Sequence, residues 1–185
     1  MLVLASVSPR RQELLRNAGI PFEVQPANIC EDPLPGENAK ECAERLAQEK
    51  ALSVARKRPA DVVLGADTVV VIDQQILGKP ADAADAARML RLLSGRAHQV
   101  ITGVSVAAEG RCSVSSETTT VTMSQITEGE IRDYVATGEP MDKAGAYAIQ
   151  GIASRWIPRI EGDYSNVVGL PVALVYRTLR RARLI

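Results

Sequence analysis

Hydrophobic and polar positions along the first half of the chain switch between strand-like and helix-like spacing. A short apolar run at residues 2–5 predicts a strand, and after a Ser-rich turn Pro9 stands where a helix begins. A second strand is expected near residues 21–25, and residues 39–57 carry the apolar spacing of a long helix. Residues 61–72 form an almost unbroken β-branched run, which is typical of a strand buried on both faces.

The middle of the chain predicts more β-structure. A turn over residues 73–80 leads into a helix over about residues 82–93. Residues 98–123 then contain two β-rich segments, joined by a turn at Glu109 and Gly110. Helices and strands therefore alternate before a β-rich region, which indicates an α/β fold with a mixed sheet.

Two further helices are expected near the C-terminus. Thr127 precedes a short helix, and Glu130 stands at the capping-box position. Residues 170–185 have amphipathic spacing, and their arginines most simply form a solvated face (Arg177, Arg180, Arg181 and Arg183). No repeat, low-complexity stretch or linker interrupts the chain, so we expect a single domain over residues 1–185.

The composition narrows the classes of function. Hydrophobic residues make up 46% of the 185-residue chain, enough for a sizeable core, and aromatic residues only 3%, so that core must be aliphatic. Lys plus Arg and Asp plus Glu both number 22, and a net charge of zero argues against stable nucleic-acid binding. The balance still allows a small anionic ligand in a local basic pocket.

The N-terminal sequence and the cysteine spacing indicate the cellular compartment in which the protein is expected. The first apolar run is too short for a signal peptide, and no run approaches the length of a membrane-spanning helix. Cys30, Cys42 and Cys112 form neither a zinc motif nor a disulfide framework. We therefore expect a cytoplasmic protein with no membrane partner.

The single histidine limits the chemistry. His98 leads into a predicted strand, where a core or strand-edge side chain is the simplest interpretation. Zinc sites built on several histidines are excluded. Catalysis must depend mainly on carboxylates, Lys, Arg, hydroxyls and hard metal ions.

Two arginines stand in the first turn of the first predicted helix, where cations oppose the helix dipole. One interpretation is a solvated surface pair. The other is an anion site that combines Arg10 and Arg11 with the free N–H groups of the helix start and the hydroxyls of Ser6 and Ser8.

Asp67 interrupts the apolar strand at residues 61–72, where an ionised carboxylate is costly unless it is paired or binds a metal. It could cap a bend near Gly65 at the strand's end. We prefer a metal ligand or general base in a cleft.

Lys50 falls in the middle of the apolar face of the long helix. That face consists of Ala39, Cys42, Ala43, Leu46, Ala47 and Val54. The lysine could reach outward to solvent, or project into a cleft and meet an anion. On the pattern alone, Lys50→Met should keep or raise the melting temperature.

Two more candidates are Glu31, in an acidic loop, and Lys79, in the sequence GKP. The latter stretch fails as a P-loop, because residue 73 is Asp rather than Gly and Lys79 precedes Pro80. A P-loop kinase is therefore disfavoured. A nucleotide sensor that binds without turnover is the main alternative to an enzyme.

Seven motifs occur in order as far as Pro171: LASVSPRRQELL, LAQEKA, GADT, GKP, HQVITGV, DKAGAYAIQG and SNVVGLP. Together they resemble the Maf family of nucleoside triphosphate pyrophosphatases. The resemblance implies two lobes around a central cleft, in a fold related to the inosine triphosphate pyrophosphatases. It also implies metal-assisted attack of water at the α-phosphorus, which releases a monophosphate and pyrophosphate.

The resemblance also implies roles for individual residues. Asp67 would be the proton acceptor, although the sequence does not separate this role from that of a metal ligand. The other polar residues of the cleft would be Ser8, Arg11, Lys50 and Lys79. Glu31 and Asp67 would hold a divalent cation, Mg²⁺ in the first place and Mn²⁺ or Co²⁺ as alternatives. Family members usually carry two adjacent acidic residues before this loop, whereas this chain has Cys30 and Glu31. This difference weakens the case for Glu31 as a metal ligand.

Three positions distinguish the base preferences within the family. Members that act on 7-methyl-GTP carry Trp, Gln and Glu there, whereas Arg10, Thr68 and Gln150 match the dTTP/UTP type. Modified pyrimidine nucleotides remain candidate substrates, and Arg10 could reach either the base or the phosphates. A homodimer is left open.

Overall fold

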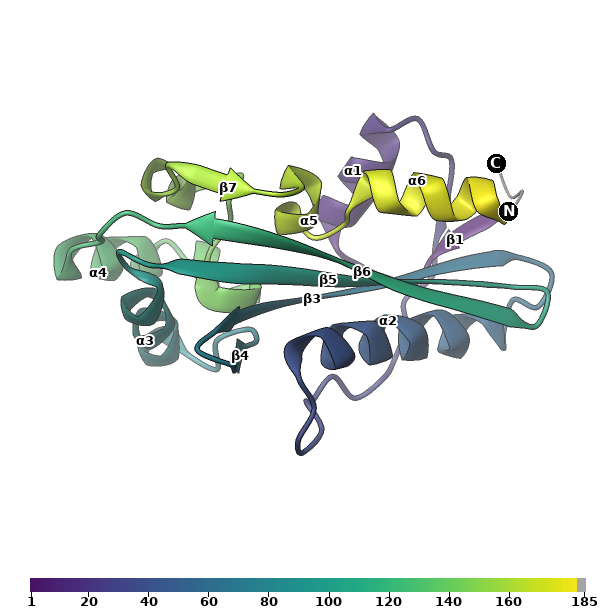
Figure 1. Ribbon diagram of the computed structural model, residues 1–185, viewed down its shortest axis with the longest axis horizontal. Helices are drawn as coiled ribbons and strands as arrows, with labels where there is room; N and C mark the ends of the chain where they lie inside the picture. Colours follow the sequence, from purple (N-terminus) through teal and green to yellow (C-terminus); the bar gives the residue numbers. More distant parts are fainter. Residues whose placement is uncertain (183–185) are drawn as a thin grey trace.

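A seven-stranded mixed sheet runs the length of the molecule in the computed structural model, which describes residues 1–182 (Figure 1). The strand order is β2-β1-β3-β5-β6-β7, with β4 paired to β3. The strands are β1 Leu2–Leu4, β2 Glu23–Val24, β3 Val62–Ile72, β4 Gln75–Leu77, β5 Ala97–Ala108, β6 Arg111–Thr122 and β7 Arg159–Glu161. Strand β1 is parallel to β2 and β3, and the remaining pairs are antiparallel.

Helices cover both faces of the sheet and one of its ends. The helices are α1 Pro9–Asn17, α2 Ala39–Ala55, α3 Ala83–Leu93, α4 Glu128–Ala136, α5 Tyr164–Val168 and α6 Val172–Arg181. Three 3₁₀ turns follow α4, namely η1 Glu139–Asp142, η2 Ala144–Ala146 and η3 Ile152–Trp156. Helix α2 lies against one face of the long strands, and α1, α5 and α6 lie against the other (Figure 1).

The α/β class and the mixed sheet are confirmed, as are several local predictions. Helix α1 begins at Pro9, and Thr127 and Glu130 form both hydrogen bonds of a capping box at the start of α4. Glu109 and Gly110 make the β5–β6 turn with φ of 50° and 74°, which suits the twist of a two-residue hairpin.

Other local predictions are wrong or incomplete. Residues 73–80 contain β4, because a tight turn at Asp73 and Gln74, with φ of 49° and 64°, folds the chain back onto β3. Strand β7, α5 and the 3₁₀ turns were not predicted, since each is too short to show a hydrophobic period. Arg183, with the rest of residues 183–185, lies outside the described residues.

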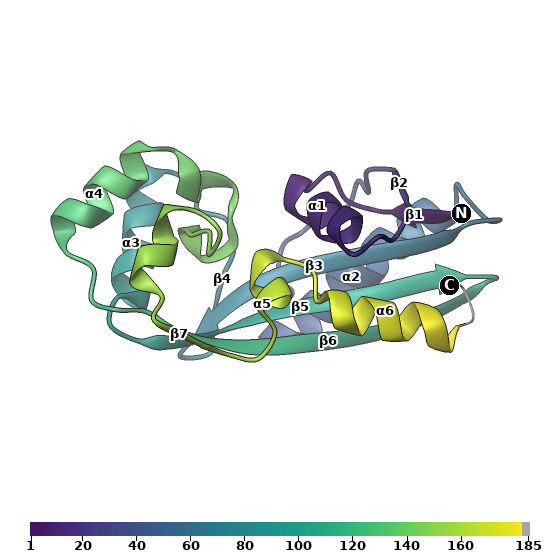
Figure 2. The same cartoon turned by 90° about the horizontal axis from the view of Figure 1, so that it is seen from above.

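The predicted two lobes are present. Figure 2 shows α3 and α4 gathered at one end of the long strands, and α1 and α6 toward the other. Each lobe has its own apolar core, built around Leu90, Tyr134 and Trp156 in the first case and Leu4 and Leu64 in the second. The long strands β3 and β5 connect the two lobes.

Strand β3 has an open edge between the lobes. On this edge β1 pairs with Val62, Val63 and Leu64, and β4 pairs with residues 70–72. Within residues 1–182, no strand pairs with residues 65–69 on the β1/β4 side, although β5 pairs with β3 continuously on the other side. Asp67 therefore lies in the unpaired stretch of β3, residues 65–69, where the edge of the sheet faces a cleft.

Helix α2 comes unusually close to the sheet beside this unpaired stretch of β3. A Cβ at Gly65 would overlap the carbonyl oxygen of Ala47 and lie 2.7 Å from the backbone nitrogen of Ala51. A Cβ at Gly103, the β5 partner of Asp67, would overlap Ala43 in the same way. Only glycine permits such contact between helix and strand backbones.

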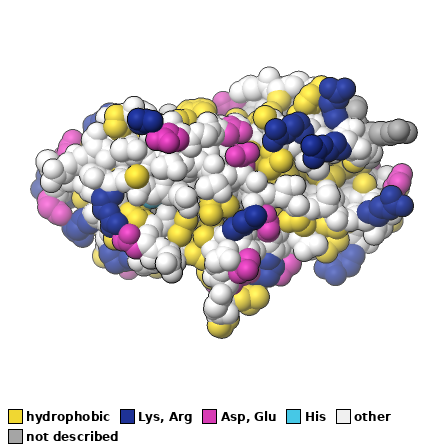
Figure 3. Space-filling model, in the orientation of Figure 1, with side chains coloured by type: hydrophobic (Ala, Val, Ile, Leu, Met, Phe, Trp, Pro, Cys, Tyr) yellow, Lys and Arg dark blue, Asp and Glu magenta, His cyan; other side chains and the backbone are white. Residues whose placement is uncertain are grey.

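The exposed surface of α6 agrees with its amphipathic pattern. Val175 and Leu179 are buried, whereas Arg177, Arg180 and Arg181 are exposed, and basic side chains gather over this helix in Figure 3. Across residues 1–182 no helix combines the length and the apolar character that crossing a bilayer requires.

His98 is a core side chain, as expected. It is buried, and its Nε2 lies 2.7 Å from the Tyr147 hydroxyl. Its Nδ1 has no hydrogen-bond partner among the described residues. Burial lowers the pKa of His98 to about 4, so the ring is neutral near pH 7 and packs in the core as an uncharged side chain.

Candidate active site

A cleft of about 720 Å³ lies between the lobes, over the open edge of β3. It is lined by all ten side chains that the sequence places at a candidate site: Ser6, Ser8, Arg10, Arg11, Glu31, Lys50, Asp67, Thr68, Lys79 and Gln150. Five cationic side chains and four carboxylates line it in total. The fold thus brings together residues that are far apart in the sequence.

Lys50 and Asp67 form a buried ion pair at the floor of the cleft. Lys50 Nζ lies 2.6 Å from Asp67 Oδ1 and 2.6 Å from Glu31 Oε1. The lysine is 7% exposed and Asp67 is 8% exposed. Lys50 therefore does not reach outward to solvent from the apolar face of α2, but meets a carboxylate of the sheet.

The alternation of β3 explains why Asp67 meets α2. Residues two apart on a strand share a face, so Asp67 lies on the same face as Gly65, where the helix touches the sheet. Thr68 points to the other face, toward α1 and α5. One strand thus supplies two different polar groups to the same cleft.

Glu31 reaches the cluster from the loop before α2. Its side chain is 48% exposed, and its Oε2 lies 3.9 Å from Lys79 Nζ. Partial burial alone would raise the pKa of Glu31, but the hydrogen bond from Lys50 and the nearby positive charges outweigh burial and lower that pKa. Glu31 is therefore ionised at neutral pH.

Asp67 and Glu31 lie around the same ammonium group, since one oxygen of each is 2.6 Å from Lys50 Nζ. Mg²⁺ in proteins is commonly held by one or two carboxylates together with phosphate oxygens, and this pair of acids is of that chemical type. Within residues 1–182, no three His, Cys, Asp or Glu side chains cluster as a metal site.

Arg11 is buried and hydrogen-bonded to the protein. Its Nε donates to the carbonyl oxygen of Gly169 at 2.8 Å, and its two terminal nitrogens donate to Ser6 Oγ and Thr68 Oγ1. Burial lowers the pKa of the guanidinium, which nevertheless stays charged at neutral pH. Arg11 therefore connects α1 with β3 and with the residue that follows α5.

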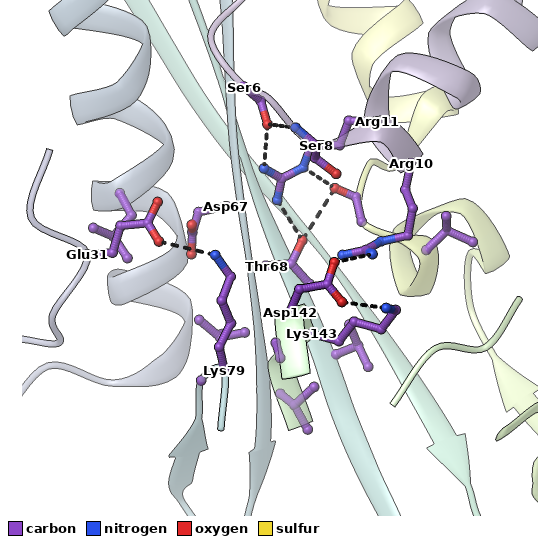
Figure 4. A pocket seen from close by; sticks show the side chains of 18 of the residues that line it. Ser6, Ser8, Arg10, Arg11, Glu31, Asp67, Thr68, Lys79, Asp142 and Lys143 are labelled. Atoms are coloured by element: carbon purple, nitrogen blue, oxygen red, sulfur yellow. Dashed lines mark hydrogen bonds and ion pairs between the residues drawn. The ribbon is translucent and has the colours of Figure 1, made fainter. Parts of the chain in front are cut away.

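Arg10 and Ser8 lie at the start of α1. The Ser8 hydroxyl makes no capping hydrogen bond, although Ser8 is the N-cap residue. Arg10 Nη1 lies 3.3 Å from Asp142 Oδ2, across the cleft in η1. Figure 4 shows Glu31, Asp67 and Lys79 on one side of the view and Arg10 and Asp142 on the other.

The wall of the cleft on the side of the lobe that contains Leu90, Tyr134 and Trp156 is largely apolar. Tyr147, Ile149, Val168 and Val70 line it, and the exposed Gln150 follows at its edge. Such a wall, with few polar groups at its rim, suits a flat heterocycle. The carboxylate cluster and the apolar wall give the cleft one ionic end and one apolar end.

The structure adds contributors that the sequence analysis does not single out, namely Asp32, Asp142, Lys143, Tyr147 and the carbonyl group of Gly169. Asp142 and Tyr147 lie in the sequence DKAGAYAIQG, one of the motifs that carry the family resemblance, so that motif is the signal that points to this segment. A backbone carbonyl leaves no signal in the sequence.

Comparison with known proteins gives consistent results. The family described as "Maf-like protein" matches residues 1–182. A protein of Koribacter versatilis named dTTP/UTP pyrophosphatase is 59% identical over 181 residues, which cover 98% of this chain and 94% of that protein. A protein of Geobacter sp. (strain M21) with the same name is 52% identical, with 97% and 94% covered.

A solved structure supports the fold assignment. The Staphylococcus aureus Ham1 protein superposes with a TM-score of 0.50 at 14% identity, and the match covers 98% of each chain. At this identity the likeness concerns the fold alone, which is similar to that of the Ham1 protein.

Replacement of Lys50 should destabilise the protein, contrary to the expectation from the helical pattern. Lys50→Met would leave the buried Asp67 carboxylate without its ammonium partner, which typically costs about 3 kcal/mol. The double variant Lys50→Met/Asp67→Asn should regain most of this loss, because no buried charge remains. Urea unfolding of both variants measures the difference. A Lys50→Met protein as stable as the wild type would show that the pair contributes little.

Proposed function

This chain belongs to the Maf-like protein family, and we propose that it hydrolyses dTTP and UTP to the corresponding monophosphate and pyrophosphate. The relatives that carry the name dTTP/UTP pyrophosphatase match nearly the whole chain. We further propose that residues 1–185 act as a single domain.

The observation that carries the proposal is the arrangement of the Lys50–Asp67 pair in the cleft. A carboxylate lies at the open edge of the sheet with a cation on one side, and a cleft with charged and apolar parts lies in front of it. Such an arrangement can bind a triphosphate at one end and a base at the other. The pair also offers a proton acceptor where the phosphates would lie.

Asp67 would act as the base in hydrolysis. Its carboxylate can accept a proton from a water molecule as the water oxygen attacks the α-phosphorus. The bond between the α-phosphorus and the α–β bridging oxygen then breaks, and pyrophosphate leaves. Lys50 would hold the carboxylate in place, and Lys79 would offset negative charge on the phosphates, because catalysis of this kind depends mostly on positioning and charge.

Nucleotide pyrophosphatases of this family depend on a divalent metal ion. We propose Mg²⁺, with Mn²⁺ and Co²⁺ as alternatives, and Asp67 and Glu31 as its protein ligands. When bound, the ion would neutralise phosphate charge and make a coordinated water more acidic. The near balance of charged side chains in the cleft supports this, since five cations opposed by four carboxylates do not by themselves neutralise a triphosphate.

The cytoplasm is the compartment that we propose for this reaction. The spacing of Cys30, Cys42 and Cys112 matches no disulfide framework, which supports a reducing compartment.

Purified protein with Mg²⁺ and dTTP should release dTMP and pyrophosphate, and Asp67→Asn should abolish nearly all turnover. The amide is almost isosteric with the carboxylate but accepts no proton at neutral pH. Asp73→Asn is the matched control, since Asp73 lies on the β3–β4 turn, paired with Arg96 outside the cleft. Binding without products would indicate a sensor. More than about a tenth of wild-type kcat in Asp67→Asn, a barrier increase under ~1.4 kcal/mol, would exclude an essential role for Asp67.

Gln150 should contribute to base selection. Its amide has both donors and an acceptor, so it can match the carbonyl and N3–H edge of thymine or uracil. We expect kcat/KM for dTTP and UTP at least ~100-fold above that for dCTP, or about 2.7 kcal/mol. Gln150→Glu should lose most pyrimidine turnover, and Gln125→Glu, on an exposed segment away from the cleft, should not. An equal loss for every substrate in Gln150→Glu would instead indicate a role in holding the loop.

A further inference from the structure

An ion pair crosses the cleft from one lobe to the other. Arg10 extends from the first turn of α1, and its Nη1 lies 3.3 Å from Oδ2 of Asp142 in η1, 132 positions later in the chain. Figure 4 shows the two side chains pointing toward each other, with Lys143 beside them. The pair therefore fixes where the Arg10 guanidinium lies relative to the two ends of the cleft.

Asp142 is held from its own lobe. Lys143 Nζ lies 2.5 Å from Asp142 Oδ1 and also donates to the carbonyl oxygen of Glu139 at 2.8 Å. Partial burial would raise the pKa of Asp142, but the hydrogen bond from Lys143 and the charges of Lys143 and Arg10 lower it. The carboxylate is thus ionised and held in place through Oδ1, and its second oxygen, Oδ2, accepts a hydrogen bond from Arg10.

Without this anchor Arg10 would have a different favoured position. A guanidinium is drawn strongly to phosphate oxygens, and the ionic end of the cleft would hold a triphosphate. The carboxylate of Asp142 competes for Arg10 and lies in the segment that leads through Tyr147 to Gln150. Arg10 is therefore held beside Asp142, on the side of the cleft opposite Glu31 and Lys79 (Figure 4).

We propose that Asp142 is a positioning residue for base selection, acting through Arg10; this rests on the proposed function. A guanidinium only donates hydrogen bonds. It can bond to the O4 acceptor of thymine or uracil but not to the 4-amino group of cytosine, which is a donor. By holding Arg10 at the base rather than at the phosphates, Asp142 favours pyrimidines with a carbonyl group at position 4.

The test compares dTTP and dCTP turnover in Asp142→Asn, which removes the charge and keeps the shape. Asp142 is exposed, with 66% of its side chain accessible, so the fold should persist. We expect the dTTP-to-dCTP ratio of kcat/KM to fall about two- to fivefold, the size expected of an exposed ion pair. The change should lie in KM for dTTP, with kcat within about twofold, and Asp142→Glu should restore the ratio in part.

Two controls separate this role from others. Asp133→Asn, at an exposed ion pair with Arg132 on α4, should leave the ratio unchanged. In an Arg10→Ala background, Asp142→Asn should have no further effect on the ratio, because Asp142 acts through Arg10.

The possible failures are distinguishable. If the wild type releases no dTMP, the proposed function fails. If the wild type is active but Asp142→Asn keeps its base ratio, or loses kcat equally for both nucleotides, the role of Asp142 in selection is overturned and the proposed function stands. An undiminished effect of Asp142→Asn in the Arg10→Ala background would also overturn it.

Discussion

The close packing of α2 on the sheet is the constraint on which the rest of the site depends. Gly65 and Gly103 lack the side chains that would hold the helix away, so the backbone of α2 touches the strands at Ala43 and Ala47. Lys50 lies one helical turn after Ala47, so its backbone is also close to β3 and its side chain can reach that strand. This is why a lysine in an apolar helix face can meet Asp67 at 2.6 Å with both groups buried.

The open edge of β3 makes this buried pair accessible to a substrate. Strand β1 pairs with β3 up to Leu64 and β4 begins to pair at Val70, so the sheet itself leaves a gap beside Asp67. In a buried part of the sheet such a gap would lower the stability of the protein, because unpaired backbone groups cost free energy when they are buried. Here it coincides with the cleft between the lobes, where solvent or a ligand can satisfy them.

The sequence predicted the parts of the site that break a local pattern. Asp67 and Lys50 were found because each is a charge in an apolar run, and such a charge needs a partner. Thr68 and Gln150 break no pattern and were identified only through the family resemblance. Asp142 was missed because its significance depends on Arg10, 132 positions away, and β7 and α5 were missed because three to five residues show no period.

The central claim is that this cleft directs water to the α-phosphorus of a pyrimidine nucleoside triphosphate. Hydrolysis of dTTP in ¹⁸O-labelled water, followed by mass spectrometry of both products, tests it most directly. The account predicts that the label enters dTMP, since the attacked α-phosphorus remains with the nucleoside, and that pyrophosphate is unlabelled. Label in pyrophosphate would mean attack at the β-phosphorus and would contradict the account.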